Sequence, residues 1–177
     1  MNVNVSGRQV SEPGFVAEIG QVLAETRVDP SRLVLEFTEG VLMQDTEATM
    51  ATLRALKVLG VRLAIDDFGT GYSSLSYVRQ FPIDILKIDR SFVASMADGP
   101  DERALMHSIL NLSETLHLET VAEGIENAGQ LAELQALGAD LGQGFLFAKP
   151  LGPTDISAML ANPGRWVDHV ESQRGVA

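Results

Sequence analysis

Short apolar runs alternate along this chain with longer stretches in which apolar residues recur at helical spacing. The runs are rich in β-branched residues, too short to be helices and almost continuously apolar, as is typical of parallel strands buried on both faces. We therefore predict six strands, at Val3–Val5, Leu33–Phe37, Val61–Ile65, Ile85–Ile88, Thr120–Ala122 and Gly144–Phe147.

The stretches between the runs carry apolar residues every three or four positions, which predicts amphipathic helices. Capping residues and glycines mark their ends. Four helices are expected: from near Pro13, from Asp45 or Thr46 to Gly60, from about Asp101 to Leu116, and from Asn127 to Gly138. The residues expected on their buried faces are Phe15, Ile19, Val22 and Leu23; Met50, Leu53, Leu56 and Leu59; Leu105, Ile109, Leu112 and Leu116; and Leu131, Leu134 and Leu137.

Repeated strand–helix–strand units imply a parallel sheet, either an open doubly wound sheet or a (β/α)8 barrel. Polar residues favour the barrel, because an open sheet concentrates its site at one switch point and a barrel gathers residues from many strand ends. The polar residues expected at the carboxyl ends of the six strands are Asn4, Glu36, Asp66 with Asp67, Lys87 with Asp89, Glu123 and Gln143. The predicted fold class is therefore α/β, of the (β/α)8 TIM-barrel-like type.

The length of the chain predicts an incomplete barrel. A full barrel takes ~250 residues, or about 31 per unit, so the 177 residues hold roughly six of the eight units. The chain begins inside a strand, so we expect about two strands to be missing on the N-terminal side. Residues 1–162 are assigned to the partial barrel domain, and the polar residues 163–177 to a C-terminal tail.

Composition narrows the range of functions. With 13 Lys and Arg against 24 Asp and Glu, the formal net charge is −11 and the pI is about 4.6, which argues against a general nucleic-acid binder. The chain has no cysteine, and its three histidines lack metal-ligand spacing. The first ten residues, MNVNVSGRQV, are polar and lack the apolar core of a signal peptide, and no apolar run approaches the ~18 residues of a membrane span. We expect a cytoplasmic protein that would need metal ions to handle phosphates.

The strongest local signal is DDFGTGYSSLSY, in which two adjacent carboxylates precede Gly69 and Gly71. Adjacent carboxylates repel each other unless a divalent cation neutralises them. The alternative is that Asp66 caps a helix and Asp67 is solvated before a glycine turn. The DFG triplet does not indicate a protein kinase, because the kinase glycine-rich loop, V-A-I-K strand and H-R-D loop are absent.

Two further charged residues lie within apolar strands. Glu36 ends an apolar run, where a carboxylate is costly to bury unless it is paired or metal-bound; the alternative is a structural salt bridge with Arg62 or Lys87. Lys87 is suited to neutralise the carboxylates or a phosphoryl oxygen, and its alternative is an ion pair with Asp89. We expect Glu39 to be an exposed residue at the start of the next loop.

The remaining candidates supply oxygen ligands and hydrogen bonds. Glu123 ends a β-run, and Glu126 either caps the next helix or orients a mobile loop. Asn4 offers a neutral oxygen ligand of the kind that Mg²⁺ and Mn²⁺ accept, and Gln143 can hydrogen-bond a base or a water. Together the candidates suit two-metal hydrolysis of a phosphodiester, in which one cation makes hydroxide and both bridge the phosphate.

Six strings in order resemble the EAL-domain family, bacterial phosphodiesterases that linearise the second messenger cyclic di-GMP. They are VNVS (Val3–Ser6), LEFTE (Leu35–Glu39), DDFGTGYSSL (Asp66–Leu75), LKIDRSF (Leu86–Phe92), VAEGIE (Val121–Glu126) and QGFLFAKPL (Gln143–Leu151). The resemblance implies two divalent cations, Mg²⁺ or Mn²⁺, with Asp66 bridging them, and metal ligands at Asn4, Glu36, Asp66, Asp67 and Glu123.

The resemblance also implies roles for other residues. Glu123 would be a ligand of the second metal, or the base in one-metal schemes. Lys87 would hold the water or the phosphate with Asp89 beside it, and Gln143 would sit near the substrate. The Asp67–Leu75 loop, with Gly69 and Gly71 and braced by Glu126, would link the metal site to a dimer interface.

One departure from the family is the missing Glu-Ala-Leu strand, whose Glu ligates metal in the family; this chain is expected to start downstream of it. Loss of this ligand should weaken metal binding, and the exposed strand edges should favour association with other chains.

Two hypotheses stand: an impaired cyclic di-GMP phosphodiesterase giving pGpG, and a non-catalytic module that binds cyclic di-GMP or proteins. A sugar- or phosphate-metabolising barrel enzyme does not explain six ordered motifs. Expected partners are a second copy of the chain and an upstream sensory or GGDEF-type domain.

Overall fold

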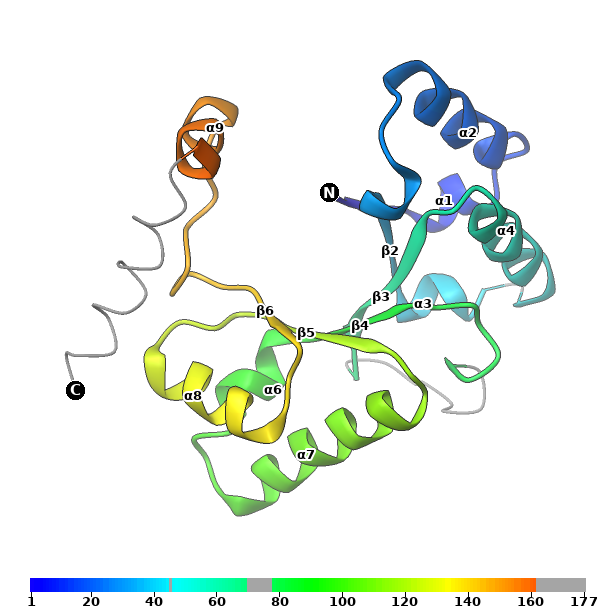
Figure 1. Cartoon of the computed structure of the whole chain (residues 1–177). Helices are drawn as coiled ribbons and strands as arrows, with labels where there is room; N and C mark the ends of the chain where they lie inside the picture. The colour runs from blue at the N-terminus through cyan, green and yellow to red at the C-terminus, as the bar shows by residue number, and fades with distance from the viewer. Residues whose placement is uncertain (45, 70–77, 162–177) are drawn as a thin grey trace. The chain divides into compact units, whose positions relative to one another are not determined.

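The computed structural model describes residues 1–44, 46–69 and 78–161, so the predicted C-terminal tail lies outside the described residues. In the described part, six strands form one sheet whose order follows the chain from β1 to β6 (Figure 1). The strands are β1 Asn2–Asn4, β2 Val34–Thr38, β3 Arg62–Phe68, β4 Ile85–Ile88, β5 Glu119–Ala122 and β6 Leu141–Gly142. A doubly wound sheet reverses its order at a switch point, so the sequential order confirms the TIM-barrel-like prediction over the open-sheet alternative.

The first of two compact units comprises residues 1–88 and 113–120. Helices α2 and α4 lie side by side in it, and α4 contacts β3 (Figure 1). The helical elements of this unit are α1 Gly7–Val10, α2 Phe15–Thr26, η1 Pro30–Arg32, α3 Glu39–Leu42 and α4 Thr46–Val58. The parallel strands β2 and β3 are buried on both faces, which explains why they read as continuous apolar runs. The side chains fully buried here include Leu35, Phe37, Leu53, Leu56, Leu63 and Ile65.

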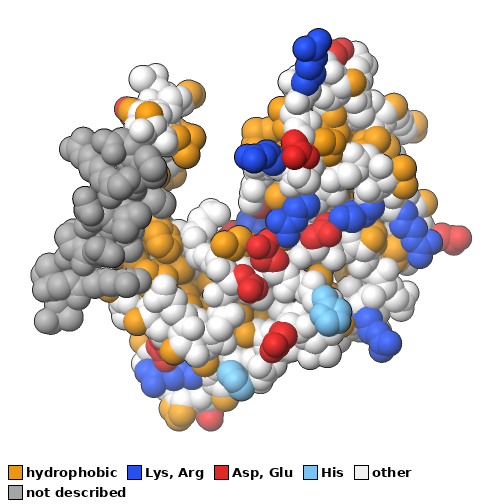
Figure 2. Space-filling model, viewed as in Figure 1, with side chains coloured by type: hydrophobic (Ala, Val, Ile, Leu, Met, Phe, Trp, Pro, Cys, Tyr) orange, Lys and Arg blue, Asp and Glu red, His pale blue; other side chains and the backbone are white. Residues whose placement is uncertain are grey.

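Ion pairs join neighbouring elements of the first unit near the start of β3. Lys57 Nζ lies 2.7 Å from both carboxylate oxygens of Asp84, and Asp84 Oδ2 accepts the backbone N–H of Leu63 at 2.8 Å. Arg62 Nη2 lies 2.6 Å from Glu119 Oε2. Figure 2 shows acidic and basic side chains next to each other over this unit, so its visible face carries both signs of charge.

The second unit comprises residues 89–112 and 121–177, of which the structure describes those up to 161. Its helices are α6 Arg90–Ser95, α7 Pro100–Thr115, α8 Ala128–Leu137 and α9 Pro153–Ala161, and the boundary between the units falls within α7 and within β5. Asn127 and Gln130 form a capping box at the start of α8, and Gly138, with a φ of 86°, ends it. Both predicted ends of this helix are therefore confirmed.

Two other helices differ from the prediction in detail. Helix α2 begins at Phe15, two residues after Pro13, with Gly14 as its N-cap at a left-handed φ of 99°. Val22, which was expected on the buried face of this helix, is exposed. In α7, Leu105 is half-exposed, and the buried face is formed by Met106, Ile109, Leu110 and Ser113. None of the helices in the described ranges is both long enough and apolar enough to cross a bilayer.

The sixth predicted strand, Gly144–Phe147, is wrong. The strand is the short β6, and the chain turns directly after Gln143. A Cβ on Gly144 would overlap the backbone of Ile125, and the N–H of Phe147 donates to the carbonyl of Gly144 at 3.1 Å. This apolar stretch is therefore a turn, which packs closely against the backbone of Ile125.

Candidate metal centre

Three charged side chains from three adjacent strands meet in the first unit. Glu36 comes from β2, Asp66 from β3 and Lys87 from β4. Lys87 Nζ lies 2.8 Å from Glu36 Oε2 and 2.7 Å from Asp66 Oδ1. Lys87 is 5% exposed and Glu36 is 4% exposed, so these are charge-assisted hydrogen bonds away from water. The sequence left open a salt bridge of Glu36 with either Arg62 or Lys87. The structure pairs Glu36 with Lys87, whereas Arg62 pairs with Glu119.

A bulge in β3 positions the two adjacent aspartates. Ile65 pairs with Leu86 and Phe68 pairs with Ile88, so three steps along β3 oppose two along β4. Consecutive side chains of a regular strand point to opposite faces, and a bulge re-aims one of them. Asp67 has a left-handed φ of 54°, and its N–H donates to Asp66 Oδ1 at 3.2 Å. Both aspartates lie within the strand, which excludes the helix-cap alternative for Asp66.

Two asparagines of β1 lie beside the buried glutamate. Asn4 is exposed and lies opposite Glu36 in the β1–β2 register. Asn2 Nδ2 donates to Glu36 Oε1 at 2.7 Å, so both oxygens of this carboxylate accept hydrogen bonds. Sequence reasoning missed Asn2, although the Asn-Val-Asn alternation places it on the same strand face as Asn4.

Glu39 corrects a further expectation. It is the first residue of α3 and is 6% exposed, so it is buried and not an exposed loop residue. Its Oε2 accepts the N–H of Gly69 at 3.3 Å, whereas its buried Oε1 accepts no hydrogen bond from the part of the chain that the structure describes. Glu39 thus contacts the start of the glycine-rich loop, whose residues 70–77, with Gly71, lie outside the described residues.

Glu123 and Gln143 belong to the second unit, where the segments that follow them lie side by side. The N–H of Ile125 donates to the carbonyl of Gln143 at 3.1 Å, and the N–H of Leu146 donates to the carbonyl of Ile125 at 2.9 Å. Gly124 takes a φ of 69°, which allows the chain to turn directly after β5. Glu123 is half-buried and Gln143 is exposed.

Asp89 and Glu126 also belong to the second unit. Asp89 is the N-cap of α6 and accepts hydrogen bonds from the N–H and the hydroxyl of Ser91. Burial raises the pKa of Asp89, but the hydrogen bonds from Ser91 together with the backbone N–H and the charge of Arg90 outweigh it and hold that pKa below its ordinary value. Glu126 is exposed and precedes the Asn127 cap, so it does not itself cap α8.

Comparison with known proteins decides the family. The sequence profile of the EAL domain matches residues 1–150. The chain belongs to the EAL domain family. This EAL chain is 40% identical over 159 residues to the bifunctional diguanylate cyclase/cyclic di-GMP phosphodiesterase MucR of Pseudomonas aeruginosa, covering 90% of the chain and 23% of MucR. It therefore spans about a quarter of that curated relative.

Solved EAL structures share the fold. The PaMucR phosphodiesterase in complex with c-di-GMP superposes with a TM-score of 0.83 at 40% identity, covering 88% of this EAL chain and 63% of that one. BlrP1 of Klebsiella pneumoniae, solved as a manganese/cyclic di-GMP complex, gives a TM-score of 0.78 at 33% identity, covering 84% of this EAL chain and 38% of that one. The EAL resemblance drawn from the six motifs is confirmed.

The first unit of the EAL chain has donors that fit a divalent cation. Glu36, Asp66 and Asp67 are carboxylates, and Asn4 adds a neutral carbonyl oxygen beside them. Such hard oxygen donors are the ligands that Mg²⁺ and Mn²⁺ prefer. Glu36 is buried, and its two oxygens contact Lys87 Nζ and Asn2 Nδ2, so both are held by hydrogen bonds.

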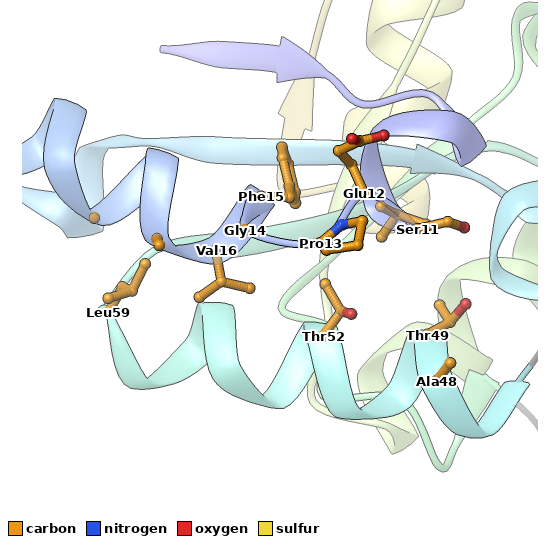
Figure 3. A pocket seen from close by; sticks show the side chains of 13 residues that line it. Ser11, Glu12, Pro13, Gly14, Phe15, Val16, Ala48, Thr49, Thr52 and Leu59 are labelled. Carbon is orange, nitrogen blue, oxygen red and sulfur yellow. The ribbon is translucent and has the colours of Figure 1, made fainter.

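A groove elsewhere in the first unit has a different chemistry. It is a cavity of about 690 Å³ between the segment that joins α1 to α2 and helix α4. Figure 3 shows Val16, Thr52 and Leu59 facing it, with the carboxylate of Glu12 directed away from α4. None of its lining residues is a predicted site residue, and it offers no cluster of carboxylates to a cation.

Proposed function

We propose that this EAL chain is a cyclic di-GMP phosphodiesterase domain that hydrolyses one phosphodiester bond to give linear pGpG with two divalent cations, Mg²⁺ or Mn²⁺. The observation that carries the proposal is the convergence of Glu36 and Asp66, from adjacent strands, on one buried point. The relatives MucR and NbdA are named as cyclic di-GMP phosphodiesterases, and two of the solved relatives described above hold cyclic di-GMP.

The proposed metal ligands are the oxygen donors at the carboxyl ends of the strands. Asp66 would bridge the two cations, since it stands next to Asp67 and near Glu36. When bound, the cations would activate a water and neutralise the phosphate. The full proposed set is Asn4, Glu36, Asp66, Asp67 and Glu123.

Three further residues are proposed to act on the substrate. Lys87 would hold the attacking water or a phosphoryl oxygen, and Asp89, two residues further on, would help to orient the substrate. Gln143 is exposed, so its amide is free of core packing and suited to a guanine base. Gly69, Gly71 and Glu126 are proposed to couple the loop to a dimer interface.

The partners and the setting follow from this activity. β1 lies at one end of the strand order and its residues are exposed, so we propose that its edge pairs with a second copy or a further strand. MucR combines the phosphodiesterase with a diguanylate cyclase, and a GGDEF-type or sensory domain is the proposed upstream partner. Because the substrate is an intracellular second messenger, we propose that the domain works in the cytoplasm.

The test is release of pGpG from cyclic di-GMP by the purified chain in excess Mn²⁺. We expect turnover that Asp66→Asn lowers by about 100-fold or more, as loss of a metal ligand requires. Glu119→Gln is the matched control, because it removes a carboxylate that pairs with Arg62 and not with the site. Protection from melting by cyclic di-GMP without turnover would favour the non-catalytic binding module. If the chain shows neither turnover nor protection from melting, the proposal is overturned.

A further inference from the structure

The buried lysine occupies the position between two proposed ligands. Lys87 Nζ bridges Glu36 Oε2 at 2.8 Å and Asp66 Oδ1 at 2.7 Å. The side chains of Lys87 and Glu36 are 6% and 4% exposed, and that of Asp66 is 13% exposed. All three residues belong to the first unit, so one ammonium neutralises carboxylates of two strands there.

The other hydrogen bonds leave few oxygens of these carboxylates unengaged. Glu36 Oε1 accepts from Asn2 Nδ2 at 2.7 Å, and Asp66 Oδ1 accepts from the N–H of Asp67 as well as from Lys87. A small divalent cation binds carboxylate oxygens at about 2.0–2.2 Å. A cation that joined the two oxygens now joined by the ammonium would therefore enter the space of the ammonium, and like charges repel there with little water to screen them.

We propose that Lys87 is an internal counter-cation that competes with the divalent ion for Glu36 and Asp66. Without metal, its ammonium prevents two poorly solvated carboxylates from facing each other uncompensated. An ion held by both Glu36 Oε2 and Asp66 Oδ1 requires the ammonium to leave at least one of these carboxylates. Lys87 thus stabilises the metal-free fold and lowers the affinity for metal. This inference rests on the metal site of the proposed function.

Mn²⁺ binding by the purified 177-residue chain tests the competition. The free ion is measured by electron paramagnetic resonance, and melting is followed with and without Mn²⁺. Lys87→Met keeps the apolar stem and removes the charge. We expect it to lower the melting temperature of the metal-free chain and to tighten Mn²⁺ binding by about tenfold or more, because the ion no longer displaces a cation. Lys57→Met is the matched control: it removes a lysine paired with Asp84, and Mn²⁺ affinity should not change.

A second variant covers the case in which Lys87→Met does not fold. Lys87→Arg keeps a cation that pairs with carboxylates at least as well, so it should bind Mn²⁺ no more tightly than the unmodified chain. Unchanged or weaker Mn²⁺ binding by Lys87→Met, or tighter Mn²⁺ binding by Lys87→Arg, would overturn the proposed competition. Either result would leave the proposed metal site itself unaffected. If the unmodified chain binds no Mn²⁺, the proposed function itself fails, which is a distinct result.

Discussion

Asp67 shows how one backbone angle contributes to the candidate site. Its φ of 54° at the β3 bulge lies in the left-handed region, which Asp, Asn and Gly tolerate and other residues adopt at a cost of about 1–2 kcal/mol. We predict that Asp67→Ala lowers the free energy of unfolding by about 1 kcal/mol relative to Asp67→Asn, since both lose the charge and Ala is the more strained. Urea denaturation in EDTA, which excludes any metal effect, measures this difference. Equal stability of the two variants would contradict the role of the bulge.

Asp89 gives a second prediction at this scale, because the hydrogen bonds from Ser91 are the largest of the causes that lower its pKa. A carboxyl group whose pKa is lower in the folded chain than in the unfolded chain stabilises the folded chain at any pH above the unfolded-state pKa, about 3.9 for Asp. This stabilisation is lost as the pH falls through the pKa of the folded state. Ser91→Ala should therefore raise the pKa of Asp89, and its stability deficit should be largest above about pH 4 and shrink on acidification. A carbon NMR titration of the carboxyl group measures this pKa. Ser91→Thr, which keeps the hydroxyl, should leave it low, and an unchanged pKa in Ser91→Ala would refute the assignment.

At the scale of elements, the strands were predictable where burial is two-sided. β2, β3, β4 and β5 each overlap a predicted apolar run, because parallel strands covered on both faces contain few polar residues. β6 was not predictable, because it has two exposed residues. It is joined to β5 through the N–H of Gln143 and the carbonyl of Ala122 at 2.8 Å, and such a long-range pairing leaves no local pattern.

The candidate site was predictable in part for a related reason. Polar residues at the ends of apolar runs identified Glu36, Asp66 and Lys87, which the structure brings together. Glu39 was missed, because a glutamate at the first position of a helix is ordinarily exposed and favoured there by the helix dipole. Its Oε2 accepts the N–H of Gly69, 30 residues further along the chain, and helical periodicity does not report such a contact.

Helix α7 provides the prediction at this scale. The sequence pattern put Leu105 on the buried face, but Leu105 is 50% exposed and Met106 is 0% exposed. Met106→Ala should destabilise the chain by about 2–5 kcal/mol through the cavity it leaves, and Leu105→Ala by less than about 1 kcal/mol. Urea denaturation midpoints compare the two variants directly. A larger loss for Leu105→Ala would restore the face predicted from the sequence.

At the scale of the whole molecule, the charge balance makes a cation the natural partner of the site. The chain carries a formal charge of −11, and within the first unit Glu36 and Asp66 contact one lysine, with Asp67 next to Asp66 along β3. A ligand that binds the folded chain and not the unfolded chain stabilises it, by about 2.7 kcal/mol at a concentration 100 times its dissociation constant. Mn²⁺ should therefore raise the melting temperature further at each increase in its concentration above its dissociation constant, which NaCl at equal ionic strength should not reproduce.

The central claim is that carboxylates at the strand ends hold divalent cations, and the melting temperature with and without Mn²⁺ tests it most directly. The variants are Asp66→Asn and Glu123→Gln, with Glu119→Gln, at the start of β5, as the matched control. The account predicts that Mn²⁺ raises the melting temperature of the unmodified chain and of the control, and that both site variants lose this rise. An unchanged rise in Asp66→Asn and Glu123→Gln would contradict it.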